Sequence, residues 1–170
     1  LILTRDSTIA TISPTLSGGN AATWEISPIL SSGLSFTNGV ISGAPTVNMT
    51  QTTYTVWANN TGGSTAGYLN ITINEPIAIF TYSNTNLIFV RSIAINTLSP
   101  VLSGGNAETW SISPQLPSGL QFDNGTIYGT PVDNMTTASY TIWANNTGGT
   151  NYGVINITIN ELTSGFAYQY

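Results

Sequence analysis

Short runs of alternating apolar and polar residues, separated by Gly, Asn and Pro, make up nearly the whole chain. In residues 68–74 (YLNITIN) the apolar side chains all fall on one face of an extended chain, and most of the polar ones fall on the other. Residues 54–58 alternate in the same way and are followed by residues 59–63 (NNTGG), which readily form turns. The pattern predicts two antiparallel strands joined as a hairpin, each with one buried and one solvated face.

The whole pattern occurs twice in the chain. Trp24 and Trp110 lie 86 residues apart, as do Trp57 and Trp143, and the offset holds without insertion or deletion throughout. A fixed period of this kind is typical of tandem modules. Helix signals are nearly absent, and about five to seven short strands fit into each period, which predicts an all-β protein of two tandem β-sandwiches.

The phase of the repeat predicts the domain boundaries. The first module covers residues 1–76 and the second covers residues 77–161, with little slack in the short link between them. The second module opens with an extra strand at residues 79–82, which the first module lacks, and residues 162–170 repeat that opening strand with no module behind it. Either the chain is a slice of a longer array, or its last strand is donated to the first module of a neighbouring copy.

The composition excludes several classes of protein. Arg5 and Arg91 are the only cations and the net charge is −5, so the chain cannot build the basic patch that nucleic acids require. No apolar run approaches the ~20 residues of a membrane span. Cys is absent, which excludes a disulfide framework. The sequence shows neither a signal peptide nor an initiator Met and reads as a mature or cut portion of a longer protein.

Several short motifs recur at equivalent places in both modules. The second module carries WSISP at 110–114, LPSGL at 116–120 and GTIYGTP at 125–131, and the first carries related forms at 24–28 and 39–45. These motifs resemble those of Ig-like domain repeats, of the cadherin-like and bacterial Ig-like type, in microbial cell-surface proteins. The resemblance covers essentially the whole chain. It implies two tandem Ig-like β-sandwich domains in an extended array that act as spacers or adhesive repeats outside the cell.

The Gly, Pro and Trp residues of these motifs have a structural explanation. Gly43 and Gly129 are expected where the chain turns without room for a Cβ, and the proline two residues later fixes the exit from each turn. Trp24 and Trp110 are large enough to fill the space between two sheets. We therefore expect these residues to belong to the fold and not to a ligand site.

No set of residues suited to catalysis recurs in both modules. His, Cys and Lys are absent, and among the carboxylates only Glu75 and Glu161 occupy equivalent positions. An acid pair of the glycosidase type would therefore have to exist in one module and be missing from its twin. We expect no enzymatic activity. The five carboxylates without an equivalent are Asp6, Glu25, Glu108, Asp123 and Asp133.

The two recurring glutamates have alternative explanations. Calcium at the module junctions would use such hard oxygen ligands, but acidic clusters of the DxD type are missing, so we predict no metal or other cofactor. The alternative, which we favour because each residue recurs, is an ion pair within each module. Arg5 would pair with Glu75, and Arg91 with Glu161.

Three groups of residues are candidates for interaction or modification. Alternation places Trp57 and Trp143 on the outer face of their strands, where an aromatic side chain can stack on a sugar, contact a neighbouring fibre or cover the sheet. Phe166 and Tyr168 are the candidates for strand donation. Seven Asn residues lie in N-x-S/T sequons and are predicted to carry N-glycans: Asn48, Asn59, Asn70, Asn124, Asn134, Asn145 and Asn156.

The sequence as a whole predicts a structural or adhesive repeat. It would be a non-enzymatic part of an extracellular filament, stalk or surface-layer-associated protein of an archaeal or bacterial cell, and strand donation is one way in which it would polymerise. Its partners would be copies of itself, in a homopolymer, and covalent N-glycans. The alternative is a carbohydrate- or cell-binding module of a larger secreted protein, which would bind host or cell-surface glycans in a concave aromatic cleft.

Overall fold

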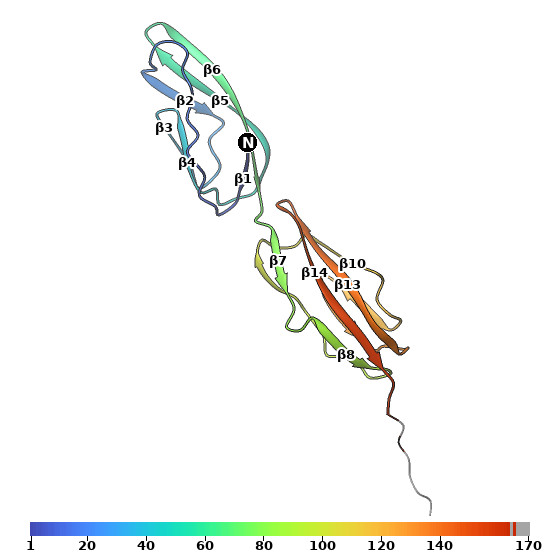
Figure 1. The fold of residues 1–170 in the computed structure, drawn as a ribbon. Helices are drawn as coiled ribbons and strands as arrows, with labels where there is room; N and C mark the ends of the chain where they lie inside the picture. The colour runs from blue at the N-terminus through green and yellow to red at the C-terminus, as the bar shows by residue number, and fades with distance from the viewer. Residues whose placement is uncertain (164, 166–170) are drawn as a thin grey trace, which may run out of the picture. The chain divides into compact units, whose positions relative to one another are not determined.

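The computed structural model describes residues 1–163 and 165, which form two compact units. Unit 1 runs from Leu1 to Pro76, and unit 2 begins at Ile77. In the described residues the structure contains β-strands and no helix, which confirms the predicted all-β class (Figure 1).

Unit 1 has six strands in its described residues. The four-stranded sheet has the order β1-β6-β5-β2, in which β1 runs parallel to β6 and the other pairs are antiparallel. A separate hairpin, β3–β4, provides the facing layer. The strands are β1 (Ile2–Thr4), β2 (Thr23–Ser27), β3 (Leu34–Thr37), β4 (Val40–Gly43), β5 (Met49–Asn60) and β6 (Gly63–Asn74).

Unit 2 repeats this architecture and adds two strands in its described residues. Its large sheet has the order β10-β13-β14-β8, and the facing layer contains the pairs β7–β9 and β11–β12. Eight strands are one more than the largest number that the sequence predicted. They are β7 (Ala78–Thr81), β8 (Asn86–Val90), β9 (Val101–Gly104), β10 (Thr109–Ser113), β11 (Leu120–Asp123), β12 (Thr126–Gly129), β13 (Met135–Asn146) and β14 (Gly149–Asn160).

The predicted hairpins are present and are longer than expected. β5 and β6 are twelve residues each and are joined by a two-residue turn, with Tyr54 opposite Leu69 and Trp57 opposite Ala66. β13 and β14 form the same hairpin in unit 2. Directly opposed residues share one face of the sheet, and residues three apart in a strand fall on opposite faces. Tyr54 is fully buried, so its face points inward and Trp57 lies on the outer face, as the alternation predicted.

The turn at the end of β12, which recurs in both units, needs glycine for a steric reason. Gly129 has a φ of +121°, and a Cβ added there would lie 2.2 Å from the carbonyl oxygen of Gly119. Gly43 holds the same conformation in unit 1, with a φ of +115°. Pro45 and Pro131 follow these turns and are fully buried, which confirms the predicted structural role of both pairs.

The two cores differ in how well they are covered. In unit 2, Ile142, Ala144 and Ile155 are fully buried on the inner face of the large sheet. Their unit 1 equivalents Val56, Ala58 and Leu69 are only half-buried. The difference arises because β7 packs on β13 and β14 in unit 2, whereas the described residues of unit 1 contain no counterpart of β7.

Candidate binding sites

The opening strand of unit 2 anchors two aromatic rings in the space between the layers. β7 pairs antiparallel with β9, with Phe80 opposite Leu102. The ring of Phe80 meets Trp110 edge-on at a centroid distance of 5.0 Å and meets Tyr82 at 5.8 Å. Edge-to-face pairs of this kind add to the stabilisation that burial provides.

Tyr82 fixes the end of the same strand. Its phenol donates a hydrogen bond to the carbonyl oxygen of Gly125, in the turn between β11 and β12. Burial raises the pKa of the Tyr82 phenol far above its ordinary value, because the charged phenolate is disfavoured away from water. The strand is therefore held by a ladder, a buried ring and one directed hydrogen bond.

A glycine makes room for the Phe80 ring. A Cβ added at Gly153, in the middle of β14, would lie 3.2 Å from the Phe80 ring. Glycine within a strand often marks a place where another chain segment approaches closely. The sequence contained this signal, since Gly67 and Gly153 recur at equivalent places within the predicted strands, but the sequence analysis did not use it.

Unit 1 has an open groove at the place that Phe80 fills in unit 2. A Cβ added at Gly67 would meet nothing within 4 Å. The groove has a volume of about 230 Å³, and its lining includes the inner-face residues Val56 and Leu69. Among the other lining residues are Ile12, Pro14, Gly39, Ile41 and Tyr68.

The backbone beside this groove is also unpaired in the described structure. Residues 15–18 are the equivalent of β9, but they form no strand. In unit 2 the same stretch is held by four opposed positions of β7, from Ala78–Gly104 to Thr81–Val101. Among the described residues, this strand-length segment of unit 1 therefore has no paired strand.

The outer face of each large sheet carries the predicted tryptophans. Trp57 and Trp143 lie on this face, but each is half-buried and not freely exposed. Trp143 stands directly opposite Tyr152, which is 67% exposed. In unit 1 the exposed tyrosine is Tyr68, which is 78% exposed. It lies two residues along β6 from Ala66, the residue directly opposite Trp57. Each unit therefore has a Trp and a Tyr on one open face.

Phe166 and Tyr168, the candidates for strand donation, lie outside the described residues. Their role as interface residues stays a prediction.

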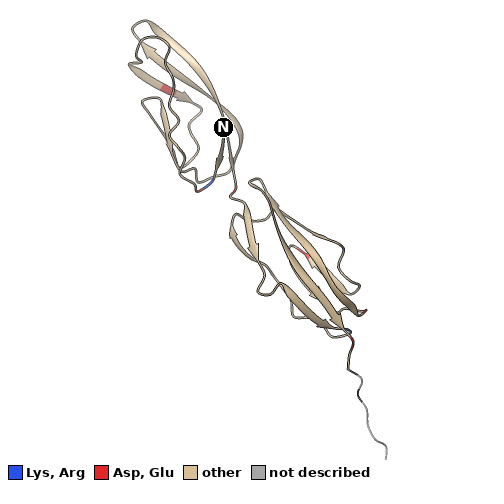
Figure 2. Cartoon of the chain, in the orientation of Figure 1, with Lys and Arg blue, Asp and Glu red and all other residues tan. Residues whose placement is uncertain are grey.

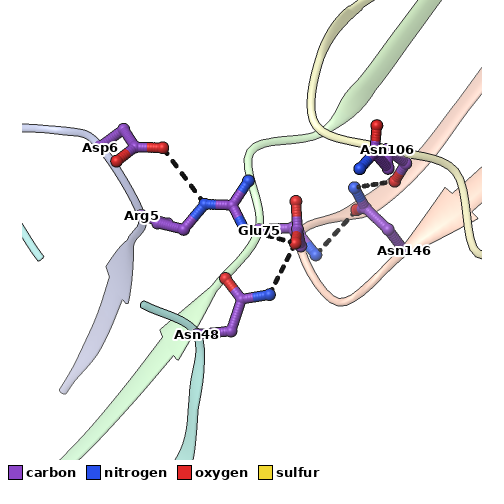
Figure 3. A network of polar contacts seen from close by, with 7 residues as sticks. Arg5, Asp6, Asn48, Glu75, Asn106 and Asn146 are labelled. Carbon is purple, nitrogen blue, oxygen red and sulfur yellow. Dashed lines mark hydrogen bonds and ion pairs between the residues drawn. The ribbon is translucent and has the colours of Figure 1, made fainter. Parts of the chain in front are cut away.

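The predicted ion pairs are both present. Arg5 Nη1 lies 2.7 Å from Glu75 Oε1, and the same oxygen accepts a hydrogen bond from the Asn48 amide at 2.6 Å (Figure 3). Arg5 also contacts Asp6 at 3.2 Å. This network ties the start of unit 1 to the end of its last strand.

The equivalent pair of unit 2 is more exposed. Arg91 Nη2 lies 3.2 Å from Glu161 Oε2, and the Glu161 side chain is 51% exposed, compared with 11% for Glu75. Figure 2 shows how few charged residues the rest of each unit carries. In the described part of the chain, no three residues of the types Asp, Glu, His or Cys lie together as a possible metal site. That the protein holds no metal or other cofactor stays a prediction.

The sequons differ in the availability of the amide nitrogen that would carry a glycan. Asn70, Asn124 and Asn134 are exposed, and within residues 1–163 and 165 their side-chain nitrogens have no hydrogen-bond acceptor. The nitrogens of the other four donate hydrogen bonds to neighbouring side chains. These four are Asn48, Asn59, Asn145 and Asn156.

Solved structures with the same fold come from multi-domain Ig proteins. The chain is similar to extracellular domains 3–5 of Drosophila OTK, with 15% identity, a TM-score of 0.52, and coverage of 94% of this chain and 58% of that one. It is also similar to the N-terminal four Ig domains of Dscam1 isoform 9.44, with 11% identity, a TM-score of 0.50, and coverage of 94% and 42%. The chain thus spans less than two thirds of either neighbour, and the likeness shows the fold alone.

Sequence comparison relates unit 2 to a known domain family. No curated protein matches the chain. No helix in the described residues has the length and apolar character needed to cross a bilayer. The profile of the family described as "Putative Ig domain" matches residues 78–160, nearly the whole of unit 2, and unit 1 repeats that unit at a fixed offset. Unit 2 is therefore similar to this family, and the fold of the chain is that of two tandem Ig-like domains.

Proposed function

We propose that this chain is a non-enzymatic structural and adhesive repeat of an extracellular filament, stalk or surface-layer-associated protein on a microbial cell. The observation that carries the proposal is the repetition of one sandwich at a fixed offset. The shared features are core positions, glycine turns and an ion pair, and none of them is a reactive group. A protein that repeats its core packing but no reactive side chains is suited to a mechanical role, in which the length and stiffness of the array matter.

The surface composition supports a location outside the cell. Only 5% of the residues are charged, and Thr, Ser, Asn and Gly provide most of the polarity. Neutral polar groups respond little to salt, since there is little charge for ions to screen. The three available sequons would add glycans to this surface, and the OTK neighbour is itself described as a set of extracellular domains.

Immunogold electron microscopy of the source cells tests this proposal. An antibody raised against unit 2 should label a filament or stalk at the cell surface at regular intervals. Label confined to the cytoplasm, or to a monodisperse secreted protein in the medium, would contradict it.

A carbohydrate-binding role is the second candidate, and one observation favours it. Trp143 and the exposed Tyr152 stand side by side on the outer face of unit 2, and aromatic side chains on an open face can stack on sugar rings. A glycan array would test this role. Binding that is lost in Trp143→Ala and retained in Thr150→Ala supports it, and the absence of binding to any glycan argues for the structural role alone.

A further inference from the structure

Unit 2 provides an internal template for a part of the fold that the described residues of unit 1 do not contain. In unit 2 an opening strand supplies a four-position ladder, a Phe ring between the layers and a Tyr phenol on a turn carbonyl. Unit 1 retains the receiving half of each of these three contacts. The ladder segment is residues 15–18, the ring position lies above Gly67, and the turn carbonyl belongs to Gly39.

The groove of unit 1 has free space at the position that the Phe80 ring occupies in unit 2. Gly153 would contact the Phe80 ring at 3.2 Å if it carried a Cβ, whereas Gly67 has free space in the same place. Val56 and Leu69 are half-buried beside it, although their unit 2 equivalents are sealed. A segment that covers these side chains would lower the free energy, because it would remove their apolar surface from water.

The end of the chain carries the pattern that fits. At the offset of the repeat, residues 164–170 (SGFAYQY) align with residues 78–84 (AIFTYSN), so that Phe166 matches Phe80 and Tyr168 matches Tyr82. An extended peptide that joins a sheet edge gains main-chain hydrogen bonds, and its alternate side chains give specificity through pockets. The Phe and Tyr occupy such alternate positions.

We propose that the groove of unit 1 is the receptor for residues 164–170 of a second copy of this chain. Phe166 of the second copy takes the place that Phe80 holds in unit 2, Tyr168 donates to the Gly39 carbonyl oxygen, and the donated backbone runs antiparallel to residues 15–18. Repetition of this contact is head-to-tail and joins copies in an open chain. The inference rests on the proposed function, for which it names the self-contact.

Sedimentation velocity of residues 1–170 over a range of concentrations tests the proposal. The chain should form dimers and longer oligomers as its concentration rises. Phe166→Ala should weaken the association about a hundredfold or more, since removing a buried aromatic ring commonly costs two or more factors of ten. Thr163→Ala, just outside the aligned segment, is the matched control and should associate like the unaltered chain.

A second variant blocks the receptor and leaves the tail intact. Gly67→Val places its side chain in the open groove, where the Cβ meets no neighbour, so unit 1 should fold and the incoming Phe should be excluded. Circular dichroism checks the fold. Oligomers that persist unchanged in both Gly67→Val and Phe166→Ala would overturn the proposal.

A third variant fills the groove with a strand from the same chain and so tests whether the occupant must come from a second copy. Joining a copy of residues 77–86 in front of Leu1 supplies the opening strand within the same chain and should give a monomer whose residues 15–18 are protected from hydrogen exchange. If the unaltered chain stays monomeric at all concentrations while this variant gains protection, the groove takes a strand from its own chain and the second copy is refuted. If the protein self-associates through the groove but is absent from the cell surface, only the proposed function is refuted. If a surface filament forms from the Phe166→Ala variant, only this inference is refuted.

Discussion

The ring of Phe80 stands edge-on to the indole of Trp110, with centroids 5.0 Å apart and planes at 67°. Trp24 holds the equivalent place in unit 1, and no other aromatic ring packs against it among the described residues. This one contact marks the difference between the two cores. Where the ring is present the inner face is sealed, and where it is absent a groove remains.

Phe80→Ala should destabilise unit 2 and leave unit 1 unchanged. Loss of a buried aromatic ring that packs on Trp110 and Gly153 leaves a cavity, and we expect unit 2 to lose about 3–5 kcal/mol of its free energy of unfolding. Hydrogen exchange followed by mass spectrometry reports the two units separately. Equal protection of β13 and β14 in both proteins would contradict the central role of this ring.

A matched pair of glycine variants should have opposite effects. Gly153→Ala places a Cβ 3.2 Å from the Phe80 ring, and the resulting overpacking should cost unit 2 about 1–3 kcal/mol. Gly67→Ala meets open space and should be neutral or slightly stabilising in unit 1, because Ala reduces the backbone entropy of the unfolded chain. Denaturant titrations of each variant measure both effects. A similar loss in both would mean that glycine serves the strand itself and not the opening ring.

Alkaline pH should weaken unit 2 through Tyr82. Burial raises the pKa of the Tyr82 phenol in the folded state, so between the unfolded and folded pKa values the unfolded chain loses a proton that the folded chain keeps. The stabilisation is fully present below about pH 10 and is lost as pH rises further. Tyr82→Phe should flatten this fall by up to about 1 kcal/mol per pH unit, less where partial exposure screens the phenol.

Tyr140 provides the internal comparison for that experiment. Burial also raises the pKa of its phenol, so some loss of stability at high pH should remain in Tyr82→Phe. Denaturant unfolding at a series of pH values between 8 and 12 is the measurement. Parallel curves for the two proteins would show that Tyr82 does not titrate with unfolding.

The two ion pairs should differ in strength because their burial differs. Glu75 accepts from Arg5 and Asn48 and is 11% exposed, so Glu75→Gln should cost about 1–3 kcal/mol. Glu161 is 51% exposed, and Glu161→Gln should cost less than about 1 kcal/mol because solvent screens the pair. Unfolding in low and high salt gives the check, and a larger effect at Glu161 would contradict the explanation from burial.

Glycans on the native protein should favour three of the seven sequons. Asn70, Asn124 and Asn134 have exposed amide nitrogens without a hydrogen-bond acceptor in the described part of the chain. At the other four sites a glycan would displace a hydrogen bond of the kind that Asn156 makes to Asn86 at 2.8 Å. Glycopeptide mass spectrometry measures the occupancy of each site. Full occupancy at Asn156 with none at Asn70 would show that folded geometry does not govern the choice.

Local patterns accounted for most of the fold. Alternation along residues 68–74 predicted the inward and outward faces of β6, and the NNTGG segment predicted the turn after β5. The single Arg and the recurring Glu of each module predicted the two ion pairs. Each prediction depends on neighbours in sequence or on a residue type so rare that few partners exist.

The sequence alone determined that the chain is a repeated β-sandwich without a recurring catalytic set, because periodicity and composition are properties of the order of residues. Only the tertiary structure decided that Trp57 and Trp143 are half-buried and that Gly67 faces an open groove. The identical glycine at position 153 lies under a ring contributed from residue 80. Burial depends on which distant segment covers a surface, and that is settled when the layers pack together and not by the residues of the strand itself.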